Sequence, residues 1–359
     1  MSTQNTENEE NAAPKSKRPS DSAFKQQRLP AWQPVLTART VLPTFFVIGV
    51  LFIPIGVILL HFSNASNELI IDYTRCMEDG GTQACADLLP NKTNENYRCK
   101  CKINFTLTED FIGDVYMYYG LTNYYQNHRR YVKSRDDEQL LGRLSQTPSS
   151  DCTPFAFAAD GKPIAPCGAI ANSLFNDTLT LSQGSSNITL LNTGIAWPSD
   201  KRVKFRNPEG NLEAALVGFE KPIFWQKPLY KLDETNESNN GFQNEDLIVW
   251  MRTAALPSFR KLYRRLDQSN NTYSKGLKAG EYTLHVEYNY PVVSFDGTKR
   301  MILSTTSVLG GKNPFLGIAY IVVGAICVTL GLALLFIHMR CSRSSNMDMI
   351  NVNPHTQYS

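Results

Sequence analysis

The residues from Val41 to Phe62 read VLPTFFVIGVLFIPIGVILLHF and contain no Asp, Glu, Lys or Arg. A second uncharged run, FLGIAYIVVGAICVTLGLALLFIHM, extends from Phe315 to Met339. A membrane-spanning helix needs roughly 20 consecutive apolar residues, and core helices of soluble proteins rarely stay uncharged for so long. We therefore expect two transmembrane α-helices, at 41–62 and 315–339, rather than two buried core helices.

The flanks of the first run predict its orientation. The run lies too far from the N-terminus and is too long to be the apolar core of a cleaved signal peptide, so it is typical of a signal anchor. Acidic residues follow it, and the residues before it are basic: Lys15, Lys17, Arg18, Lys25, Arg28 and Arg39. This bias predicts a cytoplasmic N-terminus, and two spans bring the C-terminus to the same side. The expected parts are a cytoplasmic arm (1–40), the two spans, a lumenal or extracellular domain (63–314) and a cytoplasmic tail (340–359).

Cysteines and glycosylation sequons support a lumenal domain. Six of the eight cysteines lie between the two spans: Cys76, Cys85, Cys99, Cys101, Cys152 and Cys167. All seven Asn-x-Ser/Thr sequons also lie there: Asn64, Asn91, Asn104, Asn176, Asn187, Asn236 and Asn270. Such a concentration is typical of a secretory lumen, where glycans are added and disulfides persist. Asn64 is too close to the predicted bilayer to be modified, which leaves the other six as candidates.

The spacing of the cysteines favours disulfides over zinc. The first four do not form the Cys-x2-Cys pairs that zinc sites use. Cys99 and Cys101 are too close for an easy mutual bond, so each is expected to pair with Cys76 or Cys85. Cys152 and Cys167 form a separate pair. Cys327 falls inside the second span, where packing is expected, and Cys341 just after it is a candidate for palmitoylation.

Alternating patterns dominate the segment between the spans. Apolar residues recur at every second position in 103–107, 282–290, 179–181, 188–190 and 203–205. Period-two alternation indicates strands of an antiparallel sheet with one buried face. Two stretches instead show helical spacing, one over 121–132 and one that begins at Pro257 and continues over 259–266. The predicted fold is therefore a large β-rich domain, like an antiparallel sandwich or jelly roll, with a few short helices between two transmembrane helices.

Glycines repeat at intervals of seven within the predicted spans, at Gly49 and Gly56 and at Gly317, Gly324 and Gly331. Small residues on one helix face let two helix backbones approach closely. The repeat fits contact either with a partner's helices, which we favour, or between the two helices of this chain. Just before the first span, Phe24, Arg28 and Trp32 mix aromatic and basic side chains, which fits either an interfacial anchor or a docking segment for a cytoplasmic partner.

Chemistry-bearing motifs are missing. The sequence contains no Gly-x4-Gly-Lys-Ser/Thr phosphate loop, no His-Glu-x2-His and no Gly-x-Ser-x-Gly. The net charge of +3, from 36 basic and 33 acidic residues, gives no concentrated basic field for nucleic acid. The lack of charged residues within the spans argues against an ion path through this chain. We expect no catalytic residue, no cofactor and no metal.

Several long strings resemble the cell cycle control protein 50 family, whose members are accessory subunits of phospholipid flippases, the type-IV P-type ATPases. The resemblance covers about residues 20 to 340 and is greatest to the A-type member. The strings that carry it are AFKQQRLP at 23–30, NHRRYVKSR at 127–135, PIAPCGAIAN at 163–172, NEDLIVWMRTAALP at 244–257 and GKNPFLGIAY at 311–320.

The resemblance implies disulfides that join Cys76 to Cys101, Cys85 to Cys99 and Cys152 to Cys167, and glycans at Asn104, Asn176 and Asn187. It implies that the chain forms a heterodimer with the ATPase and that both are embedded in membrane lipid. It also implies that the chain allows export of the ATPase from the endoplasmic reticulum and supports aminophospholipid translocation. The expected compartments are the endoplasmic reticulum, Golgi, secretory vesicles and plasma membrane. The alternatives are a free-standing receptor or adhesion glycoprotein, and an unrecognised ectoenzyme.

Overall fold

The computed structural model describes residues 20–29, 37–89, 98–269, 272–307 and 310–348. Two helices are long and apolar enough to cross a membrane, α1 (Ala38–Asn64) and the part of α9 (Phe315–Asp348) up to Cys341. The chain therefore has the two candidate membrane helices that the sequence predicts. In chain order, one precedes the folded domain and the other follows it. By its internal contacts the chain divides into two units. One consists of Met1–Leu51 and Val323–Ser359, and the other of Phe52–Val322.

Residues 65–314, here called the β-rich domain, contain eleven strands within the described residues. The strands are β1 (Glu68–Asp72), β2 (Cys99–Leu107), β3 (Phe111–Ile112), β4 (Val115–Leu121), β5 (Thr178–Gln183), β6 (Ser186–Ile188), β7 (Leu190–Leu191), β8 (Phe259–Leu266), β9 (Gly276–Leu277), β10 (Gly280–Tyr288) and β11 (Lys299–Thr305). The short helices are α2 (Cys85–Leu88), α3 (Arg129–Lys133), α4 (Asp137–Leu140), α5 (Ala169–Asn172), α6 (Pro198–Val203), α7 (Leu212–Ala215) and α8 (Glu245–Met251).

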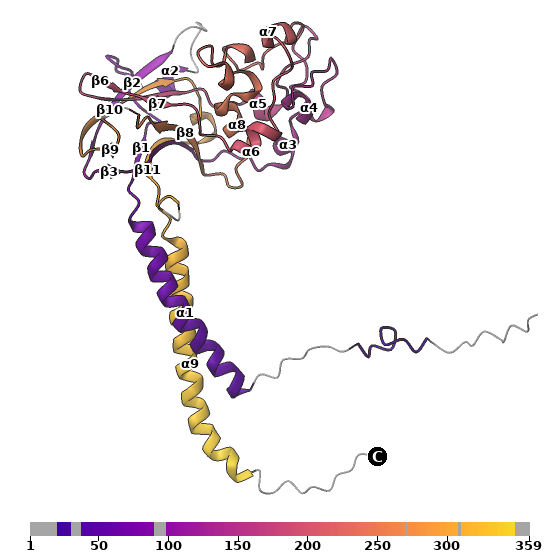
Figure 1. Cartoon of the computed structure of the whole chain (residues 1–359), viewed down its shortest axis with the longest axis vertical. Helices are drawn as coiled ribbons and strands as arrows, with labels where there is room; N and C mark the ends of the chain where they lie inside the picture. Colours follow the sequence, from indigo (N-terminus) through magenta and orange to yellow (C-terminus); the bar gives the residue numbers. More distant parts are fainter. Residues whose placement is uncertain (1–19, 30–36, 90–97, 270–271, 308–309, 349–359) are drawn as a thin grey trace, which may run out of the picture. The chain divides into compact units, whose positions relative to one another are not determined.

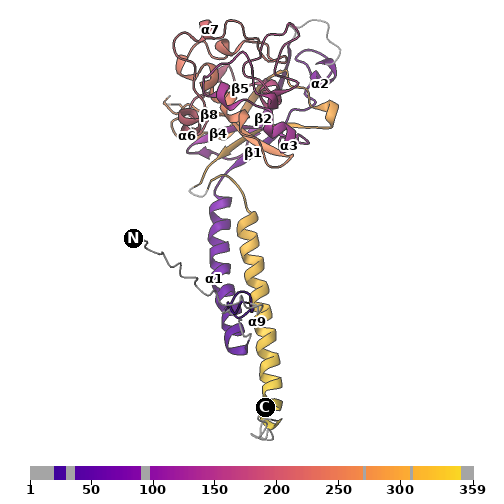
Figure 2. The same ribbon diagram turned by 90° about the vertical axis from the view of Figure 1, so that its right-hand side faces the viewer.

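The strands form two main antiparallel sheets. One has the order β1-β11-β4-β8-β7 and the other the order β2-β10-β5-β6, while β3 and β9 pair separately. Figure 1 shows the short helices α3 to α8 gathered on one side of the domain, away from β2, β6 and β10. Figure 2, the view from the side, shows β4 and β8 behind this group of helices.

The inner faces of the two sheets share one hydrophobic core. In β10, Tyr282, Leu284, Val286 and Tyr288 are buried and the residues between them are not, which confirms the predicted alternation. The chain changes sheet at Thr189, because Ile188 ends β6 in one sheet and Leu190 begins β7 in the other. Aromatic rings close the gap between the sheets, with Tyr119 stacked on Phe175 at 4.0 Å between ring centroids.

Both stretches with helical spacing differ from the prediction. The helix expected from Pro257 is the strand β8, which pairs antiparallel with β4. Its helical-looking apolar stripe is coincidental, because burial follows period two through Lys261 and Tyr263. A lysine on the buried face hides the alternation from any reading that assigns charged residues to the surface.

The helix expected over 121–132 is reduced to α3. Leu121 ends β4, and Asn123 adopts a left-handed backbone conformation with φ of 56° that stops a helix from starting there. The backbone N–H of Tyr124 then donates to the carbonyl oxygen of Pro257, so a tertiary contact replaces the helical hydrogen bond. The alternation at 203–205 is also not a strand, because Val203 is the last residue of α6 and Phe205 lies just beyond that helix.

Candidate interaction sites

The glycine repeats lie where the two long helices meet. A Cβ added to Gly56 would lie 2.8 Å from the carbonyl oxygen of Gly317, and one added to Gly317 would lie 2.8 Å from the backbone nitrogen of Leu60. Real Cβ atoms essentially never approach backbone atoms so closely, so glycine is required for this separation. The rings of Phe52 and Tyr320 add a contact with 4.8 Å between their centroids.

The same packing continues at the other glycines. A Cβ on Gly49 would collide with the side chain of Val328 and would lie 3.1 Å from the carbonyl oxygen of Gly324, and a Cβ on Gly331 would lie 3.3 Å from the Phe46 ring. These glycines, which we expected to receive a partner's helices, therefore pack the chain's own helices together. These contacts fit the alternative given above, in which the repeat packs the two helices of this chain against each other.

The outward faces of both helices are apolar and exposed. Val50, Val57 and Val323 are examples, and only 11% of each candidate span is buried within the chain. An apolar face of this size requires lipid or another membrane helix as its neighbour. These outward residues are therefore available to lipid or to another membrane helix.

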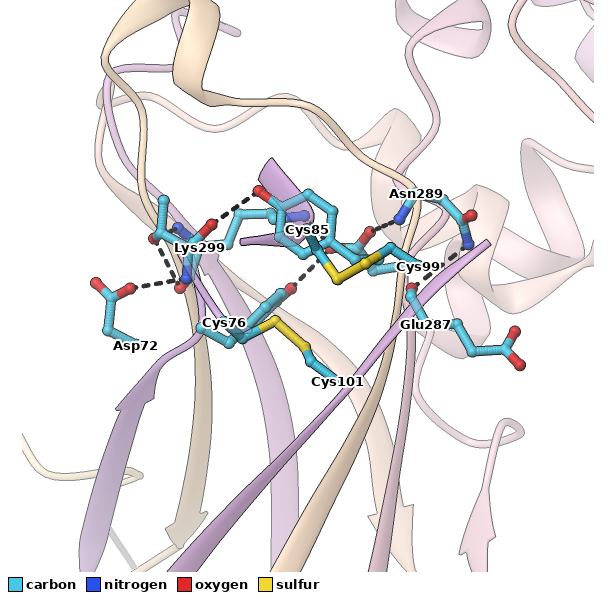
Figure 3. Close-up of a disulfide and its surroundings, with 12 residues drawn as sticks. Asp72, Cys76, Cys85, Cys99, Cys101, Glu287, Asn289 and Lys299 are labelled. Carbon is cyan, nitrogen blue, oxygen red and sulfur yellow. Dashed lines mark hydrogen bonds and ion pairs between the residues drawn. A yellow bond between two sulfur atoms is a disulfide. The ribbon is translucent and has the colours of Figure 1, made fainter. Parts of the chain in front are cut away.

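Three disulfides hold the β-rich domain. They join Cys76 to Cys101, Cys85 to Cys99, and Cys152 to Cys167, which is the pairing that the family resemblance implies. Figure 3 shows the first two bonds side by side, where the segment that carries Cys76 and Cys85 is attached to strand β2. The Sγ atoms of Cys76, Cys85 and Cys101 lie within 4.8 Å of one another. All three are oxidised, so they offer no thiolate for a metal.

A buried ion pair links the two sheets, and no feature of the sequence identified it. Lys299 at the start of β11 and Asp177 just before β5 are both fully buried, and the Lys299 Nζ donates to the Asp177 Oδ2 at 2.6 Å. The Lys299 Nζ also donates to the carbonyl oxygen of Tyr290 at 2.6 Å and lies 3.0 Å from the centroid of the Tyr288 ring. Burial lowers the pKa of the Lys299 ammonium to about 8, against the opposing effect of Asp177, so the amine stays protonated at neutral pH.

Asp177 is satisfied by several further donors. Its Oδ1 accepts from the backbone N–H groups of Asn289 and Tyr290 at 2.6 and 2.7 Å, and its Oδ2 also accepts from the Tyr73 hydroxyl at 3.1 Å. Tyr73 precedes the first disulfide-bonded cysteine, so this carboxylate joins the disulfide-bonded segment, β10 and β11. Figure 3 places Lys299 and Asn289 on either side of the two disulfides.

A second buried lysine closes the C-terminal end of α8. The Lys261 Nζ donates to the carbonyl oxygens of Val249, Trp250 and Arg252 at 3.1, 2.6 and 2.6 Å. Burial lowers the pKa of this amine well below its ordinary value of 10.5. Three acceptors nevertheless require three N–H donors, which only the ammonium form supplies, and the negative end of the α8 dipole favours that form as well.

A basic ridge runs along α6 and the residues after it. Lys201, Arg202, Lys204 and Arg206 form what we call the α6 ridge. Lys204 lines a hollow of about 490 Å³, and the other three line one of about 580 Å³. Lys201 pairs with Glu245 at 2.9 Å and Lys204 pairs with Asp200 at 3.1 Å. Arg202 and Arg206 donate to backbone carbonyls, and no carboxylate of the described residues lies within 4.0 Å of them.

An exposed aromatic residue adjoins the α6 ridge. Trp197 is 63% exposed and carries the Arg252 guanidinium over its ring at 4.8 Å. Tryptophan and arginine are enriched where proteins bind each other. Glu245 connects the α6 ridge to the segment before it. Its carboxylate accepts hydrogen bonds from the N–H groups of Ile195 and Ala196 and from the Lys201 ammonium. Burial raises the pKa of this carboxyl, but these hydrogen bonds outweigh it and hold the pKa below its ordinary value.

The candidate glycosylation sites differ in their surroundings. Asn104 on β2 and Asn187 on β6 are exposed on strands, whereas Asn176 and Asn236 are half-buried. The Asn236 side chain accepts from the Ser238 N–H within its own turn. Asn91 and Asn270 lie outside the described residues.

In the arm, the Phe24 side chain is exposed and Arg28 pairs with Asp21 at 2.9 Å. Trp32, the third residue of the predicted docking segment, lies outside the described residues. Of the two unpaired cysteines, Cys341 is exposed and Cys327 is half-buried.

One serine and one histidine lie within hydrogen-bonding distance of each other on the described strands. The Ser182 Oγ and the His285 Nε2 lie 2.8 Å apart on the paired strands β5 and β10. A serine nucleophile needs a histidine that a third group orients. Among the described residues no hydrogen bond joins His285 to a carboxylate, so the pair is a cross-strand contact rather than a catalytic dyad.

Residues 59–344 match the sequence model of the LEM3 (ligand-effect modulator 3) family, also called the CDC50 family. The chain is 57% identical over 347 residues to cell cycle control protein 50A of Bos taurus, and the alignment covers 94% of each protein. It is 48% identical over 333 residues to cell cycle control protein 50B of Homo sapiens, which covers 90% of this chain and 94% of that protein. It is also 42% identical over 340 residues to ALA-interacting subunit 3 of Arabidopsis thaliana, which covers 90% of this chain and 87% of that protein.

Proposed function

This chain belongs to the LEM3/CDC50 family of flippase accessory subunits, and we propose that it is the non-catalytic subunit that binds a type-IV P-type ATPase in the membrane. The observation that carries the proposal is the similarity to an A-type relative along 94% of the chain. It includes both helices and the domain between them. One relative is named an interacting subunit, which supports a role in assembly rather than in bond chemistry.

The contact is divided among three surfaces. The outward apolar faces of α1 and α9 pack beside the membrane domain of the ATPase, while the glycines keep the two helices together as one unit. The α6 ridge with Trp197 contacts acidic loops of the ATPase on the lumenal side, because two of its cations, Arg202 and Arg206, have no carboxylate partner within the described residues. Phe24, Arg28 and Trp32 contact the ATPase on the cytoplasmic side.

The membrane orientation follows from the same role. Both termini are cytoplasmic, and the β-rich domain faces the lumen or the cell exterior. There it carries glycans at Asn104, Asn176 and Asn187, with Asn91, Asn236 and Asn270 as further acceptors. The complex leaves the endoplasmic reticulum and passes through the Golgi and secretory vesicles to the plasma membrane.

Binding energy accounts for the activity. A subunit that binds the folded ATPase and not its unfolded chain stabilises the folded form by mass action, and export from the endoplasmic reticulum follows. Contacts that differ between transport states also favour one state over another. The ATPase supplies the phosphorylated aspartate and the lipid path, and the complex moves aminophospholipid from the outer or lumenal leaflet to the cytoplasmic leaflet.

The test is removal of this chain from cells followed by its return. Cells without it are expected to retain the ATPase in the endoplasmic reticulum and to lose internalisation of a fluorescent aminophospholipid, and the wild-type chain restores both. A variant in which Arg202, Lys204 and Arg206 are changed to Glu is expected to recover less ATPase in a mild-detergent pull-down. Its matched control changes Lys100 and Lys102 on β2 to Glu. Normal lipid uptake in cells that lack the chain would contradict the proposal and favour a free-standing receptor or adhesion protein.

A further inference from the structure

A cavity of about 220 Å³ opens beside the start of β5. All three residues of the sequon Asn176-Asp177-Thr178 line it. Its volume is smaller than the roughly 300–1,000 Å³ of sites that enclose a whole small-molecule ligand. The cavity is therefore the right size for one small ring and is too small for a lipid headgroup with its chains.

The Asn176 side chain is held with its nitrogen outward. Its Oδ1 is buried and has no hydrogen-bond partner, while its Nδ2 donates to the Gln226 Oε1 at 3.3 Å on the exposed side. Buried polar atoms are nearly always paired, so the local backbone rather than the oxygen sets this orientation. The Asn289 side chain fixes that backbone by donating to the Asn176 carbonyl oxygen at 3.2 Å. The outward atom is the nitrogen to which an N-linked sugar is attached.

The walls of the cavity combine aromatic and polar groups. Tyr263 and Phe175 supply buried rings, and Phe224 at the mouth is 67% exposed, which is unusual for a large aromatic side chain. Arg264 stacks over the Tyr263 ring at 3.9 Å and pairs with Asp246 at 2.6 Å. A sugar ring has an apolar C–H face and a rim of hydroxyl and amide groups, so it matches both kinds of wall.

We propose that this cavity seats the first N-acetylglucosamine of a glycan attached to Asn176. The ring packs its C–H face against Phe224, and its polar rim faces the Gln226 and Arg264 side chains. The proposal rests on the lumenal placement of the domain but goes beyond the accessory role, because it gives this glycan a packing function. Neither Asn104 nor Asn187 lines this cavity or the two hollows beside the α6 ridge, and both side chains are exposed, so glycans there are expected to extend into solvent.

The test measures how fast peptide-N-glycosidase F releases each glycan from the native full-length chain in mild detergent. Site-resolved mass spectrometry follows the conversion of each asparagine to aspartate. Release at Asn176 is expected to be at least about tenfold slower than at Asn104 and Asn187, which corresponds to about 1.4 kcal/mol for opening the seat. After denaturation the three sites are expected to react at similar rates.

Two substitutions locate the protection. Phe224→Ala is expected to bring the Asn176 rate close to that of Asn104, whereas the neighbouring Ile223→Ala, also exposed but not part of the cavity wall, is expected to leave it unchanged. Thr178→Ala, which removes the sequon but keeps Asn176, is expected to lower the melting temperature, and Thr178→Ser is expected to retain it. An unmodified Asn176, or native release at the same rate as Asn104, overturns the proposal. Neither outcome changes the ATPase pull-down, so the accessory role is tested separately.

Discussion

Replacing Lys299 by Met should destabilise the β-rich domain strongly, although the change adds no bulk and lies far from the disulfides in sequence. The Asp177 carboxylate would stay buried with its donors from Tyr73, Asn289 and Tyr290 but without its ammonium partner. Breaking a buried ion pair by removing one partner costs about 3–5 kcal/mol, because an uncompensated charge remains in the core. A pair on the surface would cost about 0–1 kcal/mol.

The two magnitudes are easily separated by a melting experiment. For a domain of this size, about 2–4 °C of melting temperature is lost per kcal/mol, so Lys299→Met is expected to lower it by roughly 6–20 °C. The assay is thermal unfolding of the full chain in detergent, followed by tryptophan fluorescence. Lys102→Met is the matched control, because the Lys102 pair with Asp79 is about half exposed on both sides.

A double variant tests the cause. Asn at position 177 keeps an oxygen for the two backbone N–H groups and removes the charge, so adding Asp177→Asn to Lys299→Met is expected to recover most of the lost stability. The sequon at Asn176 survives this change, since any residue except proline is accepted at its middle position. If Lys299→Met melts within about 1 °C of Lys102→Met, or if the double variant recovers nothing, the ion pair does not carry the stability assigned to it.

Four further predictions follow from other contacts. Gly56→Leu is expected to force α1 away from Gly317, at a cost of about 1–3 kcal/mol, and to reduce recovery of folded chain and ATPase, whereas the adjacent Val57→Leu, which points outward, has little effect. Cys152→Ser opens a loop whose closure is worth about 3 kcal/mol, so the chain is expected to keep endoglycosidase H-sensitive glycans and the proposed ATPase partner to stay in the endoplasmic reticulum, whereas Cys341→Ser is expected to be exported normally. Glu245 has a pKa below the ordinary value of 4.5, so its contribution to stability is complete above pH 4.5 and is lost as the pH falls through its folded-state pKa. Glu245→Gln is therefore expected to weaken the fall in melting temperature below pH 4.5, which melting experiments at a series of acidic pH values would measure. Lys261→Met leaves the carbonyl oxygens of Val249, Trp250 and Arg252 without their shared donor. The one at Trp250 is buried and costs about 1–3 kcal/mol, and the two partly buried ones add less, so a clear loss of stability is expected by denaturant unfolding.

Where one face of a strand is wet, the sequence predicted the strand. β10 alternates over its whole length between buried apolar and partly exposed polar residues, so its period is visible without any knowledge of its neighbours. β8 has the same burial period, but Lys261 occupies one of its buried positions. The Lys261 ammonium is satisfied by carbonyl oxygens at the end of α8, which lie 12, 11 and 9 residues earlier in the chain, and no carboxylate of the described residues pairs with it. Local pattern analysis assigns a lysine to the surface, and only the tertiary contact reverses that assignment.

The candidate site was predictable to a similar extent. Spacing identified the glycines as a helix-packing face, because a step of seven returns to almost the same side of a helix. It could not decide between this chain's own helices and a partner's, since both give the same sequence pattern. The Lys299–Asp177 pair was not predictable at all, because the two residues are far apart in sequence and each has an ordinary polar neighbourhood. Lys299 begins a strand that reads KRMILST and is followed directly by the partly exposed Arg300, so the sequence alone does not distinguish the buried cation from the exposed one.

The ends of the helices and the edge of one sheet constrain each other. Only Ala65, Ser66 and Asn67 separate α1 from β1, and β1 pairs with β11 from Glu68 opposite Ser304 to Asp72 opposite Arg300. Between the strands and the helices, the Asn313 N–H donates to the Ser63 Oγ at 2.9 Å, and the Ser66 Oγ donates to the Gly310 carbonyl oxygen at 3.3 Å.

Because β1 and β11 are hydrogen-bonded in fixed register, the first residues of α9 cannot slide along the end of α1 without breaking that ladder. The close contact of Gly56 with Gly317 depends on the same relative position of the two helices. A change in the β1–β11 ladder should therefore alter the Gly56–Gly317 contact, and a change in that contact should alter the ladder. Gly56→Leu is expected to increase hydrogen exchange at the backbone amides of β1, and disruption of β1 by Ile70→Pro is expected to loosen the helix pair. Exchange in β1 that is unchanged by Gly56→Leu would show that the helices and the sheet are held independently, and an ATPase bound to the helices could then not influence the β-rich domain through this route.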